Sequence, residues 1–186
     1  MTRGPYDQRR WPAEGRPAPR DLALLAGLGS AALLLGAFAF QAAGYAPCAM
    51  CLWQRWPHYL AVAAGLAAWA LRPQAGAALG AIAALGLVAA LATAGLGLFH
   101  TGVERGWWEG PASCTGAGAG LSGFTADDLL SLEGPGLVLC DEVAWSLAGL
   151  SMASWNALLS LGLAALWAAA LAGAAAGRRG RAVSET

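Results

Sequence analysis

The chain has 186 residues, of which 58% are hydrophobic and only 12% are charged, and its formal net charge is zero. Soluble domains are about half apolar and about a quarter charged, so this composition is typical of a membrane protein. The chain contains no lysine and no basic patch, so nucleic acid is excluded as an expected partner.

The N-terminal segment 1–21 is rich in arginine, proline and glycine, and we expect a disordered cytoplasmic tail. The first apolar run, Leu22–Ala43, carries no charged residue. It is long enough to cross a bilayer, which takes roughly 20 helical residues. A cleaved signal peptide is the alternative, but the run is too long for the apolar region of such a peptide. Cleavage near Ala46 would also leave only three spans, so we expect an uncleaved first helix.

Three more apolar runs follow a short turn at residues 44–47. The second run, Trp56–Leu71, is the shortest, the third is Ala75–Phe99 and the fourth is Ser154–Gly177. Their alanine, leucine and glycine content suits transmembrane helices that pack closely through small residues. Residues 22–177 are therefore expected to form an all-α domain, a four-helix bundle within the membrane.

Arginine placement predicts the orientation of these helices. Nine of the eleven arginines lie in the N-terminal tail, in the link between the second and third runs, or in the C-terminal tail 178–186. The positive-inside rule then puts both termini in the cytoplasm. The turn before the second run and the long loop 100–153 would face the periplasm or its equivalent, where disulfides persist.

The loop 100–153 is long enough to need structure or function of its own. Within it, Leu121–Leu132 predicts a short helix, since Thr125 precedes Asp128 by three residues, as in a helix N-terminal cap. Its apolar face is compatible with a helix lying along the membrane surface. A plain loop helix packed on the protein is an equal alternative.

A C-x-x-C motif, Cys48 to Cys51, follows the first apolar run. At a helix start, both sulfurs would lie near backbone N–H groups and the positive end of the dipole, which favours a reactive thiolate. Arg55 lies one turn beyond Cys51 and would suit an anion or a polar acceptor. The alternative is an interfacial arginine that reaches to lipid headgroups. Pro57 fits a helix that begins near Arg55 but would kink one that begins at Cys48.

The other two cysteines, Cys114 and Cys140, lie in the long loop. Alone, this pair would be interpreted as a structural disulfide worth roughly 3 kcal/mol. A second pair on the same side of the membrane allows disulfide exchange, which relays two electrons without a metal. A four-cysteine zinc site is the other option, but the ligand spacing and an oxidising compartment disfavour it, and we expect no metal.

His100 closes the third apolar run at the level of Arg55. It could donate a hydrogen bond or a proton to a reducible ligand, or simply cap a helix C-terminus. His58 is interpreted as a packing or water-facing side chain. Glu104 and the other loop acids are expected to be solvated charges that could orient a partner.

The order of these features resembles the DsbB family of disulfide-forming membrane proteins. PCAMCLWQRWPHY, residues 47–59, is similar to the family's C-x-x-C-x-x-x-R signature, and the loop sequences HTGVERGWWEGPASC and LCDEVAWSLAGLSMASWNALLS are similar as well. The resemblance covers about residues 22–176. It implies a thiol:quinone oxidoreductase that reoxidises a soluble periplasmic partner, a DsbA-like oxidase with a thioredoxin fold.

The resemblance also implies a role for each cysteine. Cys114 would form the mixed disulfide with the reduced partner, after which Cys140 would exchange with Cys48. Cys51 would then pass electrons to the quinone pool of the lipid bilayer, with ubiquinone favoured over menaquinone.

Arg55 and His100 would polarise the quinone oxygens and so stabilise developing negative charge. Gln54 stands where better-known members carry glutamate, which puts any role of that acid in doubt.

Three competing interpretations remain open. A vitamin K epoxide reductase-like enzyme also pairs a four-helix core with a quinone, but its C-x-x-C follows the loop cysteines, the reverse of the order here. A membrane scaffold with two structural disulfides would bind no quinone. A reductant that carries electrons outward depends on potentials that the sequence does not give.

Overall fold

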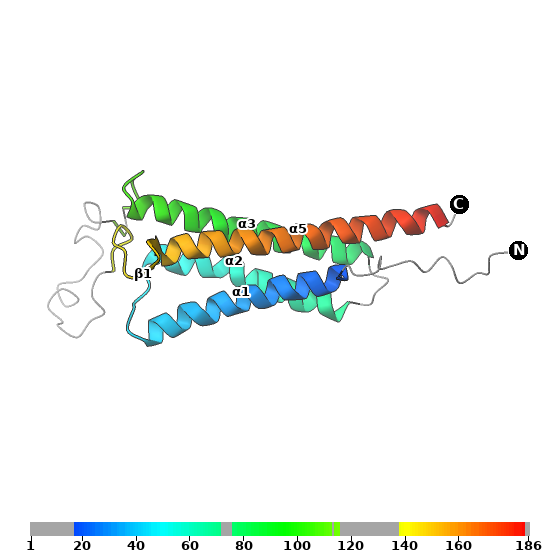
Figure 1. The fold of residues 1–186 in the computed structure, drawn as a ribbon, viewed down its shortest axis with the longest axis horizontal. Coiled ribbons are helices and arrows are strands. Elements are labelled where there is room, and N and C mark those ends of the chain that lie inside the picture. The colour runs from blue at the N-terminus through cyan, green and yellow to red at the C-terminus, as the bar shows by residue number, and fades with distance from the viewer. Residues whose placement is uncertain (1–16, 72–75, 113, 116–137, 185–186) are drawn as a thin grey trace, which may run out of the picture.

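A computed structural model describes residues 17–71, 76–112, 114–115 and 138–184 of the chain. Within these residues four long helices run side by side along the molecule, and a small hairpin closes one end (Figure 1). The elements are α1 (Pro19–Ala42), α2 (Ala49–Ala70), α3 (Gly76–Glu104), β1 (Ser146–Leu147), β2 (Leu150–Ser151) and α5 (Met152–Ser184). The predicted all-α four-helix bundle is confirmed, while the short helix predicted at 121–132 lies outside the described residues.

The second helix begins earlier than its apolar run suggested. Cys48 has an extended backbone, with φ −72° and ψ 170°, and its sulfur accepts a hydrogen bond from the backbone N–H of Cys51 at 3.3 Å. A side-chain acceptor of this kind satisfies one of the N–H groups that a helix start leaves unpaired. The helix therefore starts at Ala49 and runs through Pro57, so the start near Arg55 that Pro57 would have suited was wrong.

The third and fourth helices also extend beyond their apolar runs. α3 continues to Glu104, so His100 lies inside the helix and the loop begins later than expected. α5 is preceded by the antiparallel pair β1–β2, whose turn residues Ala148 and Gly149 have φ of 52° and 76°. Two positive φ values in a two-residue turn match the twist of a hairpin. Ser151 Oγ then accepts from the N–H of Ser154 at 3.2 Å and caps α5.

Small residues pack the half of the bundle that lies away from the hairpin. α1 and α2 cross where Gly27 faces Gly65, and a Cβ added to Gly27 would lie 2.9 Å from the Gly65 Cα. The buried Trp167 indole on α5 packs against Gly86 of α3. Buried alanines fill the space between these contacts. Glycine and alanine let helix backbones approach closely, as they do in membrane helix bundles.

Three of the four helices are long and apolar enough to cross a membrane, namely α1, α3 and residues 152–180 of α5. α2 does not meet this criterion within the part of the chain described, and its first half carries Gln54, Arg55 and His58. The start of α1 and the end of α5 lie at the same end of the bundle (Figure 1). The hairpin and the start of α2 lie at the opposite end, which we call the cysteine end.

Candidate active site

The dithiol of the C-x-x-C motif lies at the start of α2. The sulfur atoms of Cys48 and Cys51 are 2.9 Å apart, and Cys48 is buried. A hydrogen bond from the Cys51 thiol is the largest influence on the pKa of Cys48 and lowers it. Burial raises this pKa, and a hydrogen bond from His100 lowers it further, so that the pKa falls from 9.0 to about 4. Cys48 is therefore a thiolate at neutral pH when the pair is reduced.

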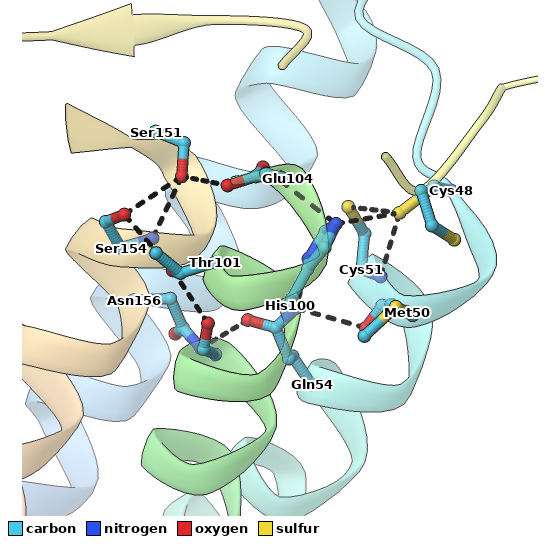
Figure 2. Close-up of polar contacts among 12 residues, drawn as sticks. Cys48, Met50, Cys51, Gln54, His100, Thr101, Glu104, Ser151, Ser154 and Asn156 are labelled. Carbon is cyan, nitrogen blue, oxygen red and sulfur yellow. Dashed lines mark hydrogen bonds and ion pairs between the residues drawn. The ribbon is translucent and has the colours of Figure 1, made fainter. Parts of the chain in front are cut away.

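α3 brings His100 to this dithiol. The ring is 3% exposed, and its Nε2 lies 3.6 Å from the Cys48 sulfur (Figure 2). The helix continues for another turn, so the alternative of a histidine that caps the helix end was wrong. The two sulfurs and a ring nitrogen all lie within 4.8 Å of one another. A soft metal ion would be the competing occupant of such a cluster.

Glu104, expected to be a solvated loop charge, is instead enclosed. Its side chain is 6% exposed, and Oε1 lies 3.9 Å from His100 Nε2. Ser151, at the end of the hairpin, donates a short hydrogen bond to Glu104 Oε2, and its hydroxyl also contacts Ser154 (Figure 2). The expectation failed because α3 runs one turn further than the apolar residues do, which carries the carboxylate against α5.

The second cysteine pair packs against the first. Cys114 and Cys140 form a disulfide, and the N–H of Cys140 donates to the carbonyl of Cys114 at 2.5 Å. Both residues belong to one buried cluster with Cys48, in which Met50 and Val103 also take part. Cys48 and Cys140, the first and last of the four cysteines, are 92 residues apart in the sequence. All four are nevertheless gathered at one end of the bundle.

Arg55 points from α2 toward α1. Its Nη1 donates to Gln41 Oε1 at 3.0 Å, and the guanidinium lies 4.8 Å from the centre of the Phe38 ring. The residue is 9% exposed, and its Nε has no hydrogen-bond partner among the described residues. The interpretation as an arginine that reaches out to lipid headgroups does not fit this enclosed position.

A cavity of about 380 Å³ connects these groups. Side chains of α1, α2 and α5 form most of its wall, and the apolar lining includes Phe40, Leu159 and, from the segment just before β1, Trp145. Its polar lining includes both thiols of the C-x-x-C motif, Arg55, His58 and His100. Cavities of this size with mostly apolar walls and a few polar groups bind small organic molecules. The buried, unpartnered Arg55 Nε is a donor available to an oxygen of such a ligand.

The sequence analysis did not predict a row of hydrogen-bonded polar side chains inside the bundle. Asn156 of α5 donates to Gln54 Oε1 at 2.8 Å, and Gln54 in turn reaches His100 Nδ1 at 2.9 Å. His58, taken for a packing or water-facing residue, bonds to Asn156 at 2.9 Å and to Thr93 at 3.1 Å. The usable signal was the presence of polar residues within otherwise apolar helices, which marks functional or packing sites in membranes.

Comparison with known proteins identifies the family. A family model described as disulfide bond formation protein DsbB matches residues 19–170. The disulfide bond formation protein B of Methylococcus capsulatus is 36% identical over 154 residues, which cover 80% of this chain and 92% of that protein. No solved structure matches the chain. The chain belongs to the DsbB family and is a multi-pass membrane protein of the disulfide-forming oxidoreductases.

Proposed function

We propose that this DsbB family member reoxidises a soluble, DsbA-like thioredoxin-fold oxidase and passes the electrons to membrane quinone. In this proposal both termini are cytoplasmic and all four cysteines face the periplasm of a bacterial inner membrane. The arginine distribution supports this orientation, because nine of eleven arginines lie toward the ends and links opposite the cysteines.

One observation carries the proposal. A single cavity with largely apolar walls is lined by Cys48, Cys51 and the buried Arg55, and the Cys114–Cys140 disulfide packs beside it. A quinone is a flat apolar ring with two carbonyl oxygens, so it fits apolar walls with a few donors. Arg55 is the residue of this chain that would bind one of those oxygens and stabilise negative charge on it, while His100 lines the same cavity with its Nε2 facing the Cys48 sulfur.

The thiol chemistry follows from the order of the pairs. The partner's thiolate attacks the Cys114–Cys140 disulfide at Cys114, which releases the Cys140 thiolate. Cys140 attacks Cys48 of an oxidised C-x-x-C motif and releases Cys51. The partner's second thiol then resolves its mixed disulfide and frees Cys114. Cys114 attacks Cys140, which restores the Cys114–Cys140 disulfide, releases Cys48 and leaves the C-x-x-C pair reduced for the oxidant. Each turnover moves two electrons from two partner thiols, and their two protons accompany these electrons to the oxidant.

Quinone supplies the two-electron oxidant when it is bound. The chain's own contribution is an enclosed thiolate beside a fixed positive charge, since Cys48 is ionised at neutral pH and Arg55 lines the same cavity. We favour ubiquinone over menaquinone. The two are separated by comparing the rates at which the purified protein reduces each analogue with the same reduced partner.

The proposal is tested with purified protein, a ubiquinone analogue and a reduced DsbA-like oxidase, with quinone loss followed by ultraviolet absorbance. Cys51→Ser and Cys114→Ser should each abolish turnover. Ser160→Ala is the matched control, because Ser160 is buried on α5 without a hydrogen-bond partner among the described residues. Turnover that continues in either cysteine variant would overturn the proposal, whereas no turnover by the unmodified protein would favour a scaffold with structural disulfides.

A further inference from the structure

The orientation of the Gln54 amide is determined by its neighbours. Gln54 Nε2 lies 3.1 Å from the backbone carbonyl of Met50, and Gln54 Oε1 lies 2.8 Å from Asn156 Nδ2. A carbonyl oxygen only accepts hydrogen bonds, so the Gln54 atom beside Met50 has to be the nitrogen. With the amide rotated by half a turn, two oxygens would face each other in a buried site.

The Asn156 amide is oriented by the same argument. Its Nδ2 faces the backbone carbonyl of Thr93 at 3.5 Å and the Thr93 hydroxyl at 3.1 Å. That hydroxyl already donates its hydrogen to the backbone carbonyl of Gln54 at 3.1 Å, so it can only accept from Asn156. Two carbonyl groups on different helices therefore define the directions of both amides independently.

These directions determine which nitrogen of His100 carries the hydrogen. Gln54 Nε2, a donor only, lies 2.9 Å from His100 Nδ1, so Nδ1 has to accept and carries no hydrogen. The ring hydrogen is then on Nε2, the nitrogen that lies 3.6 Å from the Cys48 sulfur. A doubly protonated ring would place N–H against N–H at Gln54. The amide therefore opposes the charged form of His100.

We propose that Gln54 is a positioning residue that holds His100 neutral, with its hydrogen on Nε2, so that the ring donates a hydrogen bond to the Cys48 thiolate. His100 then stabilises this sulfur anion without removing a proton from it. The hydrogen bond from His100 is among the causes of the low pKa of Cys48. Two other titratable groups face the ring, Cys51 on α2 and Glu104 one turn further along α3. The Glu104 carboxylate favours the charged ring, and the Gln54 amide acts against it.

The inference gives the cysteine end a directional chain of hydrogen bonds across three helices. Asn156 on α5 donates to Gln54 on α2, Gln54 donates to His100 on α3, and His100 donates to Cys48 (Figure 2). A glutamate at position 54 could only accept, and would require a hydrogen on Nδ1. The identity of residue 54 thus selects the state of the histidine beside the redox sulfur.

The test is nitrogen NMR of the histidine side chains in the reduced protein, labelled with ¹⁵N. The chain has only two histidines, so the signals lost in His100→Asn identify those of His100. We expect His100 Nδ1 to show the shift of a bare ring nitrogen and Nε2 that of an N–H. A protonated Nδ1 in the unmodified protein would overturn the proposal without the use of any Gln54 variant.

Two substitutions add a functional readout, the pH profile of Cys48 alkylation. Gln54→Leu removes the donor to His100, and we expect the midpoint of the Cys48 alkylation profile to rise by about one pH unit. At a pH below both midpoints, this is a roughly tenfold smaller thiolate fraction. Gln54→Glu should move the hydrogen to Nδ1 and add a second titration step from His100. Thr101→Val is the matched control, because Thr101 adjoins His100 in α3 but bonds to Gly97 and Ser154.

Unchanged His100 signals and an unchanged Cys48 profile in Gln54→Leu would also contradict the inference. The inference rests on the proposed role of Cys48 as a redox thiol, but the inference and the proposed function can be disproved independently of each other. Loss of the inference alone would leave quinone reduction by the unmodified protein intact. Loss of the proposed function would leave the predicted tautomer in place with no turnover.

Discussion

The two ends of the bundle differ in what joins their helices. Away from the cysteines, contacts are made by backbone and small side chains, as where Gly27 meets Gly65 and where Trp167 covers Gly86. At the cysteine end, hydrogen bonds join the helices, as from Asn156 to Gln54 and on to His100. Close packing continues here, since a Cβ added to Gly97 of α3 would lie 3.0 Å from the backbone N of Ala157 on α5. The difference teaches that directed polar contacts are added at the cysteine end to helices that shape alone holds elsewhere.

This contrast separates the effects of substitutions. Enlarging a side chain in the closely packed half should lower stability and leave the chemistry of surviving molecules intact. Removing a donor at the cysteine end should change reactivity more than stability, because double-mutant cycles assign interhelical hydrogen bonds in membranes only about 0.6 kcal/mol on average.

The largest effect is expected from pH on the cysteine end. The pKa of Cys48, lowered to about 4, means that its thiolate is present above that pH and is lost only as the pH falls through it. At pH 6 an ordinary thiol with a pKa of about 8.5 is only about 0.3% ionised, so the thiolate fraction of Cys48 should be roughly three-hundredfold greater. Alkylation of a Cys51→Ser variant is not informative, because Cys51 itself supplies the main hydrogen bond. The measurement is therefore alkylation of the reduced native pair, with the modified residue identified by mass spectrometry. A midpoint near pH 8 or 9 would contradict the expectation.

In the closely packed half, Gly65→Leu should lower the free energy of unfolding by at least about 3 kcal/mol, the upper end of overpacking costs. A Cβ at this position would lie 2.8 Å from the Gly27 Cα, and neither backbone can move aside without separating α1 from α2. Thermal denaturation in detergent measures the loss. Gly95→Leu is the control, since an added Cβ there meets nothing within 4 Å. Equal destabilisation by both substitutions would refute the close-packing argument.

Arg55→Ala should lower kcat/KM for the quinone analogue by about 10- to 100-fold, the range for losing a charge-assisted hydrogen bond. The thermal midpoint should change little, because the Gln41 contact is the only side-chain hydrogen bond that the described residues offer to Arg55. Arg105→Ala removes an arginine from the same end, where Arg105 stacks on the exposed Trp107. Comparable kinetic losses in both variants would indicate a general effect of charge rather than a role at the cavity.

The smallest effect is expected from Ser151→Ala, which removes both the cap of α5 and the hydroxyl that contacts Glu104. Loss of a helix cap costs about 1 kcal/mol, and a fall of that size should appear in thermal denaturation. Ser151→Thr keeps the hydroxyl and should retain most of the stability. If both variants behaved alike, the hydroxyl would have no part in holding the hairpin against α3.

The sequence predicted the four helices because uninterrupted apolar runs depend on local composition alone. It also indicated that Cys48 and Cys140 share one end, since two spans, an even number, lie between the turn that carries Cys48 and the loop that carries Cys140. Helix ends were less predictable. Both Glu104 and Met152 lie beyond their apolar runs, and at the start of α5 the Ser151 cap decides the boundary.

Contacts between helices could not be predicted from the sequence, for a different reason. Gln54, Asn156 and Thr93 meet only after three helices are set at particular rotations, and a periodic pattern is weak where nearly every residue is apolar or small. The pairing of Gly27 with Gly65 likewise depends on where two helices cross. The chemistry-bearing cysteines could be identified one by one, whereas the groups that orient their neighbours could not.

The central claim is that the two cysteine pairs lie close enough to exchange disulfides. It is tested most directly in a Cys51→Ser, Cys114→Ser double variant, which retains only Cys48 and Cys140. Mild oxidation, proteolysis and mass spectrometry should show these two joined within one molecule, as their shared buried cluster predicts. Two free, alkylatable thiols after the same treatment would contradict the account.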